Sequence, residues 1–263
     1  MSVDGLADGL DLSILAPAFM AGVIVLITHI PLGREVIKRG IIFIDLAIAQ
    51  IAGLGVIVAF QFGWEMHGIE AQFAAVISAL FGAWLLHSIE KKAGEHLEAL
   101  IGVSFVLAAT ASIVMLAHNP HGSEHLKELL VGQILWVDWS QIISAAIVSI
   151  IVAFIWFNYK HKIGNIGFYI LFALSITVSV QLIGIYLVFT SLIVPALAAV
   201  KYPTNPALLL AAIIGITGYF MGLIVSALFD LPSGAVIVWC LAISALFIPV
   251  VLSKMFITFK NDS

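Results

Sequence analysis

The sequence predicts an all-α integral membrane protein, a polytopic bundle of eight or nine transmembrane helices. Hydrophobic residues make up 62% of the 263 residues, charged residues make up 10%, and the mean hydropathy is +1.17. A soluble domain of this length has too little interior to bury so much apolar surface. The spacing of the apolar runs and the placement of the basic residues support the same fold class.

Nine apolar runs are long enough, or nearly long enough, to cross a bilayer, since a spanning helix needs roughly 20 residues. They cover residues 13–31, 41–62, 71–89, 98–117, 141–158, 164–182, 184–200, 207–228 and 235–253. The sixth and seventh runs meet at the sequence QLIG with almost no loop. They are either two helices or one helix followed by a broken, half-crossing segment, so the count is eight or nine.

The basic residues gather on one side of the predicted bundle. With nine crossings, ten of the 11 Lys and Arg residues fall on the same side, namely Arg34, Lys38, Arg39, Lys91, Lys92, Lys160, Lys162, Lys201, Lys254 and Lys260. Lys127 falls on the other side. Because loops rich in Lys and Arg stay in the cytoplasm, we expect the N-terminus outside and the C-terminus in the cytoplasm. No basic patch of the kind that binds nucleic acid is present.

Asp45 lies in the second apolar run, six residues after Arg39, and so about 9 Å into a helix. A charged carboxylate in hydrocarbon costs roughly 2.5–3.5 kcal/mol on insertion scales. One interpretation pairs it with Arg39 or Arg34 near the interface, and the other makes it a cation or proton site on a pathway. Gln50 points about 140° away from Asp45 round the same helix, which favours a role in helix packing over one as a ligand.

Glu98 begins the fourth run, where a carboxylate also interacts favourably with the helix dipole. It lies at the same predicted depth as Asp45, so the two carboxylates could form an acidic pair. His29 and His87 lie at the same end of the first and third runs. A lone membrane histidine is more often a hydrogen-bonding core residue than a ligand.

The longest predicted outer loop carries a second group of candidate ligands, His118, His121, Glu124 and His125. His121 and His125 are four residues apart, so one face of a helix can present both. Imidazole and carboxylate groups suit zinc among other first-row metals. A solvated loop also tolerates histidine freely, so this loop is either a metal-capture site or a polar connector.

Motifs in order along the chain resemble one family of membrane proteins. PLGREVIKRGIIFIDLAIAQIAGLG is similar to a PLG, a basic residue and a G-D-x-L-x-H-A helix, with Arg39 and Asp45 at the family spacing. LEALIGVSF resembles an acidic-x-x-x-G segment, with Glu98 and Gly102 in those positions. LKELLVGQILWVDWSQI is similar to a Y-L-F-G-x-x-L loop, with Gly132 on its glycine.

Two later segments extend the resemblance over nearly the whole chain. GIYLVFTSLIVPALAA resembles G-x-L-L-x-x-x-L-L-x-x-P-A-A-T-A, and FDLPSGAVIV resembles D-x-P-x-G-P/A. The matching positions are Gly184, Ser191, Pro195, Ala196, Asp230, Pro232 and Gly234. The ordered set resembles the membrane permease subunits of zinc/manganese-type ABC importers.

The resemblance implies that residues 1–263 form a single transmembrane permease domain in the inner membrane. It implies a second copy that completes the translocation path, two cytoplasmic ATPases and an extracytoplasmic metal-binding protein. ATP hydrolysis then occurs on a partner, so this chain is not an enzyme. It binds no covalent cofactor, and its cargo is a divalent cation of the zinc, manganese or iron class. Asp45, Glu98 and Gln50 become candidates for the path.

The sequence departs from the family at two places. Ala49 stands where the family has a histidine four residues after its aspartate. The cytoplasmic loop after the fifth run, which in the family holds a coupling helix that docks on the ATPase, is cut to NYKHKIGNIG. Two other functions therefore stay open: a metal or proton carrier or channel that works without an ATPase, and an accessory membrane subunit with no pathway.

Overall fold

The computed structural model describes residues 11–66 and 68–261, except for the side chains of residues 91 and 252–261. It consists of α2 (Leu12–Arg39), α3 (Ile44–Gln61), α4 (Ile69–Ala93), η1 (Gly94–His96), α5 (Leu97–Leu116), α6 (Gly122–Val131), η2 (Ile134–Trp136), α7 (Trp139–Ile183), α8 (Ile185–Ala198), α9 (Thr204–Phe229) and α10 (Ser233–Asn261). Helices account for all regular structure over these residues, as predicted. The side chains of Lys91, Lys254 and Lys260, used above to orient the chain, lie outside the described set.

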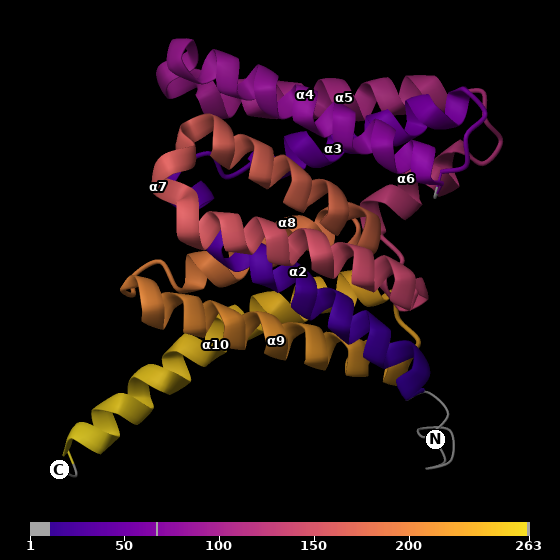
Figure 1. Cartoon of the computed structure of the whole chain (residues 1–263). Helices are drawn as coiled ribbons and strands as arrows, with labels where there is room; N and C mark the ends of the chain where they lie inside the picture. The colour runs from indigo at the N-terminus through magenta and orange to yellow at the C-terminus, as the bar shows by residue number, and fades with distance from the viewer. Residues whose placement is uncertain (1–10, 67, 262–263) are drawn as a thin grey trace.

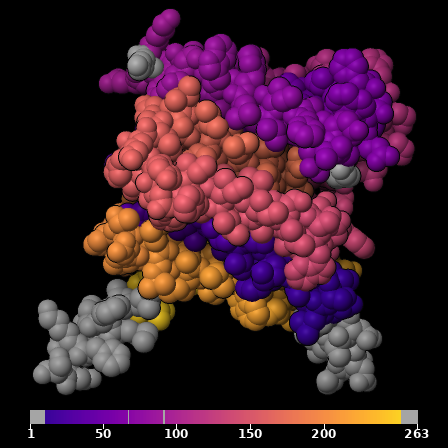
Figure 2. Space-filling view, viewed as in Figure 1, coloured from indigo at the N-terminus to yellow at the C-terminus, as the bar shows by residue number. Residues whose placement is uncertain are grey.

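The helices form three tiers, which Figure 1 shows as ribbons and Figure 2 as a close-packed surface. Helices α3, α4 and α5 pack together in one tier, and α2, α9 and α10 lie in the opposite one. Helix α7 lies between them and packs against both α2 and α4. Helix α8 is also central, and it contacts α2 and α10.

Helix α7 spans 45 residues but is not one straight rod, because Gly164 adopts φ 61° and ψ −164° and breaks it. The ribbon doubles back at this point (Figure 1). Gln141 near the start of α7 and Gln181 near its end line the same cavity, which confirms that the two limbs are antiparallel. The fifth and sixth apolar runs are therefore the two limbs of α7, residues 139–163 and 165–183.

Within residues 11–66 and 68–261, seven helices are long and apolar enough to cross a membrane, counting α7 once. Helix α8 is apolar but has 14 residues, which is short of the roughly 20 that a full crossing needs. It starts after a sharp backbone turn at Gly184, where φ is 77°. The seventh apolar run therefore matches the broken, half-crossing alternative.

The basic ends of the helices lie together at one end of the bundle. Arg34 at the end of α2 donates from Nη1 to the carbonyl oxygen of Thr204, the first residue of α9, at 3.1 Å. Arg39 donates from Nη1 to Oδ1 of Asn165 at the α7 bend, at 3.2 Å. Asn165 in turn donates to Oε2 of Glu90 near the end of α4, at 3.4 Å. The positive-inside rule predicts that this end faces the cytoplasm.

Candidate functional site

Asp45 lies in the first turn of α3 and is completely buried. Neither of its carboxylate oxygens has a side-chain hydrogen-bond partner among the described residues. Glu98, in the first turn of α5, accepts a hydrogen bond on Oε1 from the backbone N–H of Phe43 at 3.1 Å. Phe43 is two residues before Asp45, so the structure brings the two carboxylates to the same depth.

The second oxygen of Glu98, Oε2, is buried and has no hydrogen-bond partner in the described part of the chain. Over the described residues, the acidic pair therefore presents three buried oxygen atoms that no other side chain reaches with a hydrogen bond. A buried carboxylate without a partner carries a large desolvation cost, which a bound cation or proton removes. This arrangement is chemically suited to a cation-binding site made of hard oxygen ligands.

Arg34 and Arg39, the two possible partners of Asp45, interact with other groups. Arg39 forms an ion pair with Glu35, in which Nε lies 2.8 Å from Oε1, and its guanidinium lies 4.1 Å from the ring centroid of Phe168. Arg34 bonds to the carbonyl oxygen of Thr204. No ion pair joins Asp45 to either arginine, so the structure does not support the interpretation that Asp45 is neutralised by pairing at the interface.

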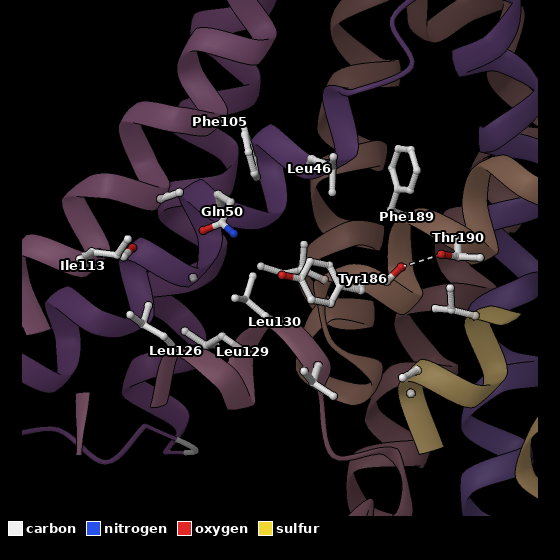
Figure 3. A pocket seen from close by; sticks show the side chains of 18 of the residues that line it. Leu46, Gln50, Phe105, Ile113, Leu126, Leu129, Leu130, Tyr186, Phe189 and Thr190 are labelled. Atoms are coloured by element: carbon white, nitrogen blue, oxygen red, sulfur yellow. Dashed lines mark hydrogen bonds between the residues drawn. The ribbon is translucent and has the colours of Figure 1, made fainter. Parts of the chain in front are cut away.

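Gln50 lines a cavity of about 660 Å³ between α3, α5 and α6 on one side and α8 and α10 on the other. Figure 3 shows its amide directed into this space, opposite Tyr186 and Thr190 of α8. Most of the lining is apolar, including Phe105 and Phe189. Asp45 does not line this cavity, so the structure does not bring Gln50 and the acidic pair together, in agreement with the 140° offset expected from the sequence.

Of the candidate ligands in the histidine loop, only Glu124 and His125 lie in α6 (Gly122–Val131), and the structure separates the candidates. His121 and Glu124 lie on the surface with side chains 73% and 77% exposed and 3.4 Å between Nδ1 and Oε2. His118 is also exposed. His125 instead packs against Phe60 with ring centroids 5.2 Å apart. In the described part of the chain no three His, Cys, Asp or Glu side chains lie close enough to hold one metal ion.

His125 belongs to a different environment, a polar cavity of about 70 Å³. Its Nδ1 lies 3.9 Å from Oε2 of Glu128, and Gln133 donates to Oε1 of the same Glu128 at 2.6 Å. Gln72, Gln141 and Gln181 complete the polar part of the lining. The sequence alone does not group these glutamines, because they come from three separate apolar segments, although each is a polar residue near the end of an apolar run.

Gly132 and Gly184 form a close backbone crossing between the chain after α6 and the start of α8. Both have positive φ, 73° and 77°, a region that favours glycine. A Cβ atom added to either would overlap the backbone of the other. These two family-motif glycines are therefore needed for a tight contact that sets where α8 begins, beside the cavity that holds Gln50.

The remaining motif residues also have structural positions. Ser191 and Pro195 are buried in α8, and Oγ of Ser191 lies 2.7 Å from the hydroxyl of Tyr219. Asp230 ends α9 in the left-handed conformation, with φ 50°, and Pro232 precedes α10. Two glycines and one alanine complete the set: Gly234 packs on the carbonyl of Val131, Ala196 is buried, and a Cβ on Gly102 would meet nothing within 4 Å.

His29 and His87 differ in their surroundings. His29 is completely buried, and neither ring nitrogen has a hydrogen-bond partner among the described residues. It is therefore not the hydrogen-bonded core histidine that the sequence favoured. His87 lies at the basic end, with Nδ1 3.4 Å from Oε2 of Glu90 and its ring 5.3 Å from that of Tyr169.

Comparison with known families gives a match to the ABC 3 transport family over residues 11–164 and 158–253. The two matched segments meet at the bend of α7. Together they cover most of the chain, in agreement with the resemblance that the ordered motifs indicate.

Individual proteins are similar over comparable lengths. A Chlamydia trachomatis protein described as "Probable metal transport system membrane protein" is 23% identical over 229 residues, which is 78% of each chain. A Haemophilus influenzae protein described as "Probable iron transport system membrane protein" is 25% identical over 256 residues, covering 89% of this chain and 92% of its own.

Among solved structures, PsaBC from Streptococcus pneumoniae in complex with Fab has a chain with a TM-score of 0.74 and 22% identity, covering 93% of this chain and 94% of that one. This match shows a shared fold. The family match and the apolar helices lead to one conclusion: the chain is a multi-pass protein of the inner membrane and belongs to the ABC 3 transport family.

Proposed function

We propose that this chain is the membrane permease subunit of an ABC importer for a divalent metal ion, and that Asp45 and Glu98 lie on the translocation path. The observation that carries the proposal is the burial of Asp45 without a basic partner. The names of the Chlamydia and Haemophilus relatives, which refer to metal and iron transport, support the same class of cargo.

A metal ion that leaves water needs ligands that replace its hydration shell. The three unsatisfied oxygens of Asp45 and Glu98 offer such ligands and negative charge. Carboxylate oxygens suit manganese, and imidazole suits zinc and iron. Because Ala49 stands at the family's histidine position, manganese is favoured over zinc and iron.

A direct binding measurement tests the acidic pair. Purified protein is equilibrated with Mn²⁺ or Zn²⁺, and the bound metal is counted by mass spectrometry of the eluted protein. Asp45→Asn and Glu98→Gln should each lower occupancy at least tenfold, while Glu70→Gln, which removes an exposed carboxylate elsewhere, should retain wild-type binding. Equal metal binding by wild type and Asp45→Asn would show that the pair is not a metal site.

A second copy of the chain is proposed to complete the pathway. The cavity of about 660 Å³ is bounded by α3, α5, α6, α8 and α10 and is partly open to the surface. Its wall is largely apolar, with Gln50, Tyr186 and Thr190 as polar groups. A second copy seated against this opening would enclose a passage with a mostly apolar wall.

Coupling to ATP needs a contact that differs between the states of the transporter. The α7 bend offers little for this purpose, because residues on both sides of Gly164 are helical. We propose that an ATPase docks on the segment HSIEKKAGEHLE, residues 87–98, which covers the end of α4, η1 and the start of α5 and includes the exposed Lys92 and Glu95. An extracytoplasmic metal-binding protein would meet the opposite end, near α6.

Co-purification of the tagged chain from its native membrane tests this docking. A stoichiometric ATPase should be recovered, and the joint change of Lys91, Lys92 and Glu95 to Ala should remove it. The short bend of α7 favours one other function, a carrier or channel that works without an ATPase. Recovery of no ATPase, together with metal transport that ATP depletion leaves unchanged, would establish that alternative.

The histidines of the outer loop are proposed to concentrate metal at the mouth of the pathway. His118, His121 and Glu124 are exposed and free to rearrange around an ion, and His125 lies one helical turn further on. Changing the three histidines to Ala should lower uptake at scarce metal and leave it unchanged at abundant metal. Identical uptake by the wild type and the triple variant at both metal levels would mean that this loop is only a polar connector.

A further inference from the structure

A second cavity, of about 390 Å³, lies at the basic end of the bundle and has no part in the proposed pathway. It is bounded by the last turns of α2, the first limb of α7, the end of α8 and the first turns of α9. Arg34, Lys38 and Lys160 line it. These residues come from two helices that are far apart in the sequence, so the fold gathers their charges at one place.

The charges in this cavity do not balance. Glu35 is the carboxylate in its described lining, and its Oε1 is already paired with Nε of Arg39 at 2.8 Å. Lys38 and Lys160 are exposed and form no ion pair with the described residues. Arg34 uses one of its five N–H donors on the carbonyl of Thr204, at 3.1 Å. The cavity therefore has an excess of positive charge and of unused donors.

The N-terminus of α9 adds to this positive potential. Thr204, the first residue of α9, lines the cavity, and the preceding Pro203 supplies no side-chain cap to the free N–H groups of the first turn. Unsatisfied N–H groups and the helix dipole favour a bound anion at this position. Helix α9 has 26 residues, so its dipole is fully developed.

The rest of the wall is apolar and opens towards the outer surface of the bundle. Trp156 and Leu208 form part of it, and Phe157 and Val200, which are 57% and 50% exposed, form its rim. Exposed aromatic and aliphatic residues next to the end of transmembrane helices face lipid near the headgroup level. One cavity thus combines a cationic surface with an apolar rim.

We propose that this cavity binds the phosphate headgroup of an anionic phospholipid, with the acyl chains along Phe157 and Val200. Basic pockets between transmembrane helices, at the level of the headgroups, suit such lipids. Lipid is favoured over an acidic protein segment because the rim is apolar and its residues, Phe157 and Val200, are exposed on the surface of the bundle. A free phosphate would satisfy the cations but leave the apolar rim without a partner.

The test uses the full-length protein in nanodiscs that contain equal amounts of phosphatidylglycerol and phosphatidylcholine. Native mass spectrometry of the released protein counts the lipids that remain bound. The pocket variant is Lys38→Gln with Lys160→Gln. The matched control is Lys162→Gln with Lys201→Gln, which removes two exposed lysines from the same end of the bundle but outside the cavity.

Wild type and control should retain phosphatidylglycerol in preference to phosphatidylcholine. The pocket variant should lose this preference by about 25-fold, since it lacks two lysines and each basic residue near an anionic lipid contributes roughly fivefold. Added glycerol phosphate at the same phosphate concentration should not displace the lipid. Displacement by glycerol phosphate would show that the site takes a free phosphate, and would overturn the lipid assignment.

Two further outcomes would also overturn the proposal. One is an equal preference in the pocket variant and the wild type. The other is an unchanged preference together with loss of a co-purifying ATPase in the pocket variant, which would assign the cavity to a protein partner.

Discussion

Arg39 donates a hydrogen bond from Nε to Oε1 of Glu35 at 2.8 Å, and this ion pair keeps the arginine away from Asp45, six residues further on. The same guanidinium reaches Asn165 and the face of Phe168, so it joins the end of α2 to the bend of α7. Arg39 thus stabilises the basic end of the bundle, and Asp45 is left without a countercharge.

Arg39→Gln is therefore expected to affect stability but not metal binding. The loss of an ion pair whose side chains are 21% and 23% exposed, together with a cation–π contact, should lower the free energy of unfolding by about 1 kcal/mol. Thermal unfolding in detergent measures this change, and metal counting on the purified protein measures the binding. Glu35→Gln serves as the control for the ion pair alone. A tenfold change in metal affinity in Arg39→Gln would mean that Arg39 does act on Asp45.

Gly132→Ala and Gly184→Ala should both be strongly destabilising. The positive φ alone costs about 1–2 kcal/mol for a residue with a Cβ, and the overlap of the two backbones adds to this cost. We expect little folded protein in fluorescence-detected size-exclusion chromatography of either variant.

Gly102→Ala is the matched control, because Gly102 is helical and a Cβ there meets nothing within 4 Å. It should fold as well as wild type, or be more stable by up to about 1 kcal/mol. Normal folding of Gly132→Ala would show that the close crossing of the two glycines is not needed.

The orientation of the chain is tested by labelling single cysteines in a Cys240→Ala background. Ser123 in α6 and Lys201 between α8 and α9 are both exposed and lie in segments that the charge asymmetry places on opposite sides. In intact cells an impermeant maleimide should label Ser123→Cys and spare Lys201→Cys. The reverse pattern would invert the predicted topology.

Gly33, which lies in the same predicted cytoplasmic segment as the other basic-end residues, is unsuitable for such a probe. A Cβ at this position would overlap the carbonyl of Leu192, so a cysteine there would disturb the packing of α2 against α8. This contact is an example of what the sequence does not reveal, because the two residues are far apart along the chain.

Asp138 caps α7, and its charge should make the stability of this helix depend on pH. Its Oδ1 accepts hydrogen bonds from the backbone N–H of Gln141 at 2.9 Å and Ser140 at 2.8 Å. These bonds lower the pKa of Asp138 below its ordinary value of 3.8. Because the folded-state pKa is the lower one, the stabilisation is complete above the unfolded-state pKa and is lost as the pH falls through the folded-state pKa.

Asp138→Ala should therefore lower the thermal unfolding temperature at neutral pH, and the gap from wild type should narrow in acid. Asp138→Asn keeps the capping oxygen without the charge and should lie between the two at neutral pH. Thermal unfolding of the three proteins across this pH range measures the effect. A gap that does not change with pH would mean that the charge of Asp138 plays no part.

The apolar runs predicted the helices well because hydrophobicity dominates the placement of segments in a bilayer. The two limbs of α7 and the short α8 lie where the fifth, sixth and seventh runs were expected. The sequence also predicted that Glu98 lies at the same depth as Asp45, since each lies near the start of an apolar run at the same predicted side of the membrane. The angle between Gln50 and Asp45 around the helix predicted that their side chains point in different directions, and Gln50 lines a cavity that Asp45 does not.

Other parts of the site depend on contacts between distant segments. Tyr186 and Thr190 face Gln50 across the cavity, yet nothing in their local sequence pairs them with it (Figure 3). The sequence also did not decide which carboxylate Arg39 pairs with, because Arg34, Glu35, Arg39 and Asp45 all lie within a few helical turns. Such choices are set by tertiary packing, which one sequence does not specify.

Metal uptake by cells that carry Asp45→Asn tests the central claim most directly. The substitution keeps the size of the side chain and removes the charge at the buried position. At equal amounts of protein in the membrane, uptake of radioactive Mn²⁺ should fall at least tenfold, while Gln50→Ala should retain a larger share of wild-type uptake. Wild-type uptake by Asp45→Asn would contradict the assignment of Asp45 to the translocation path.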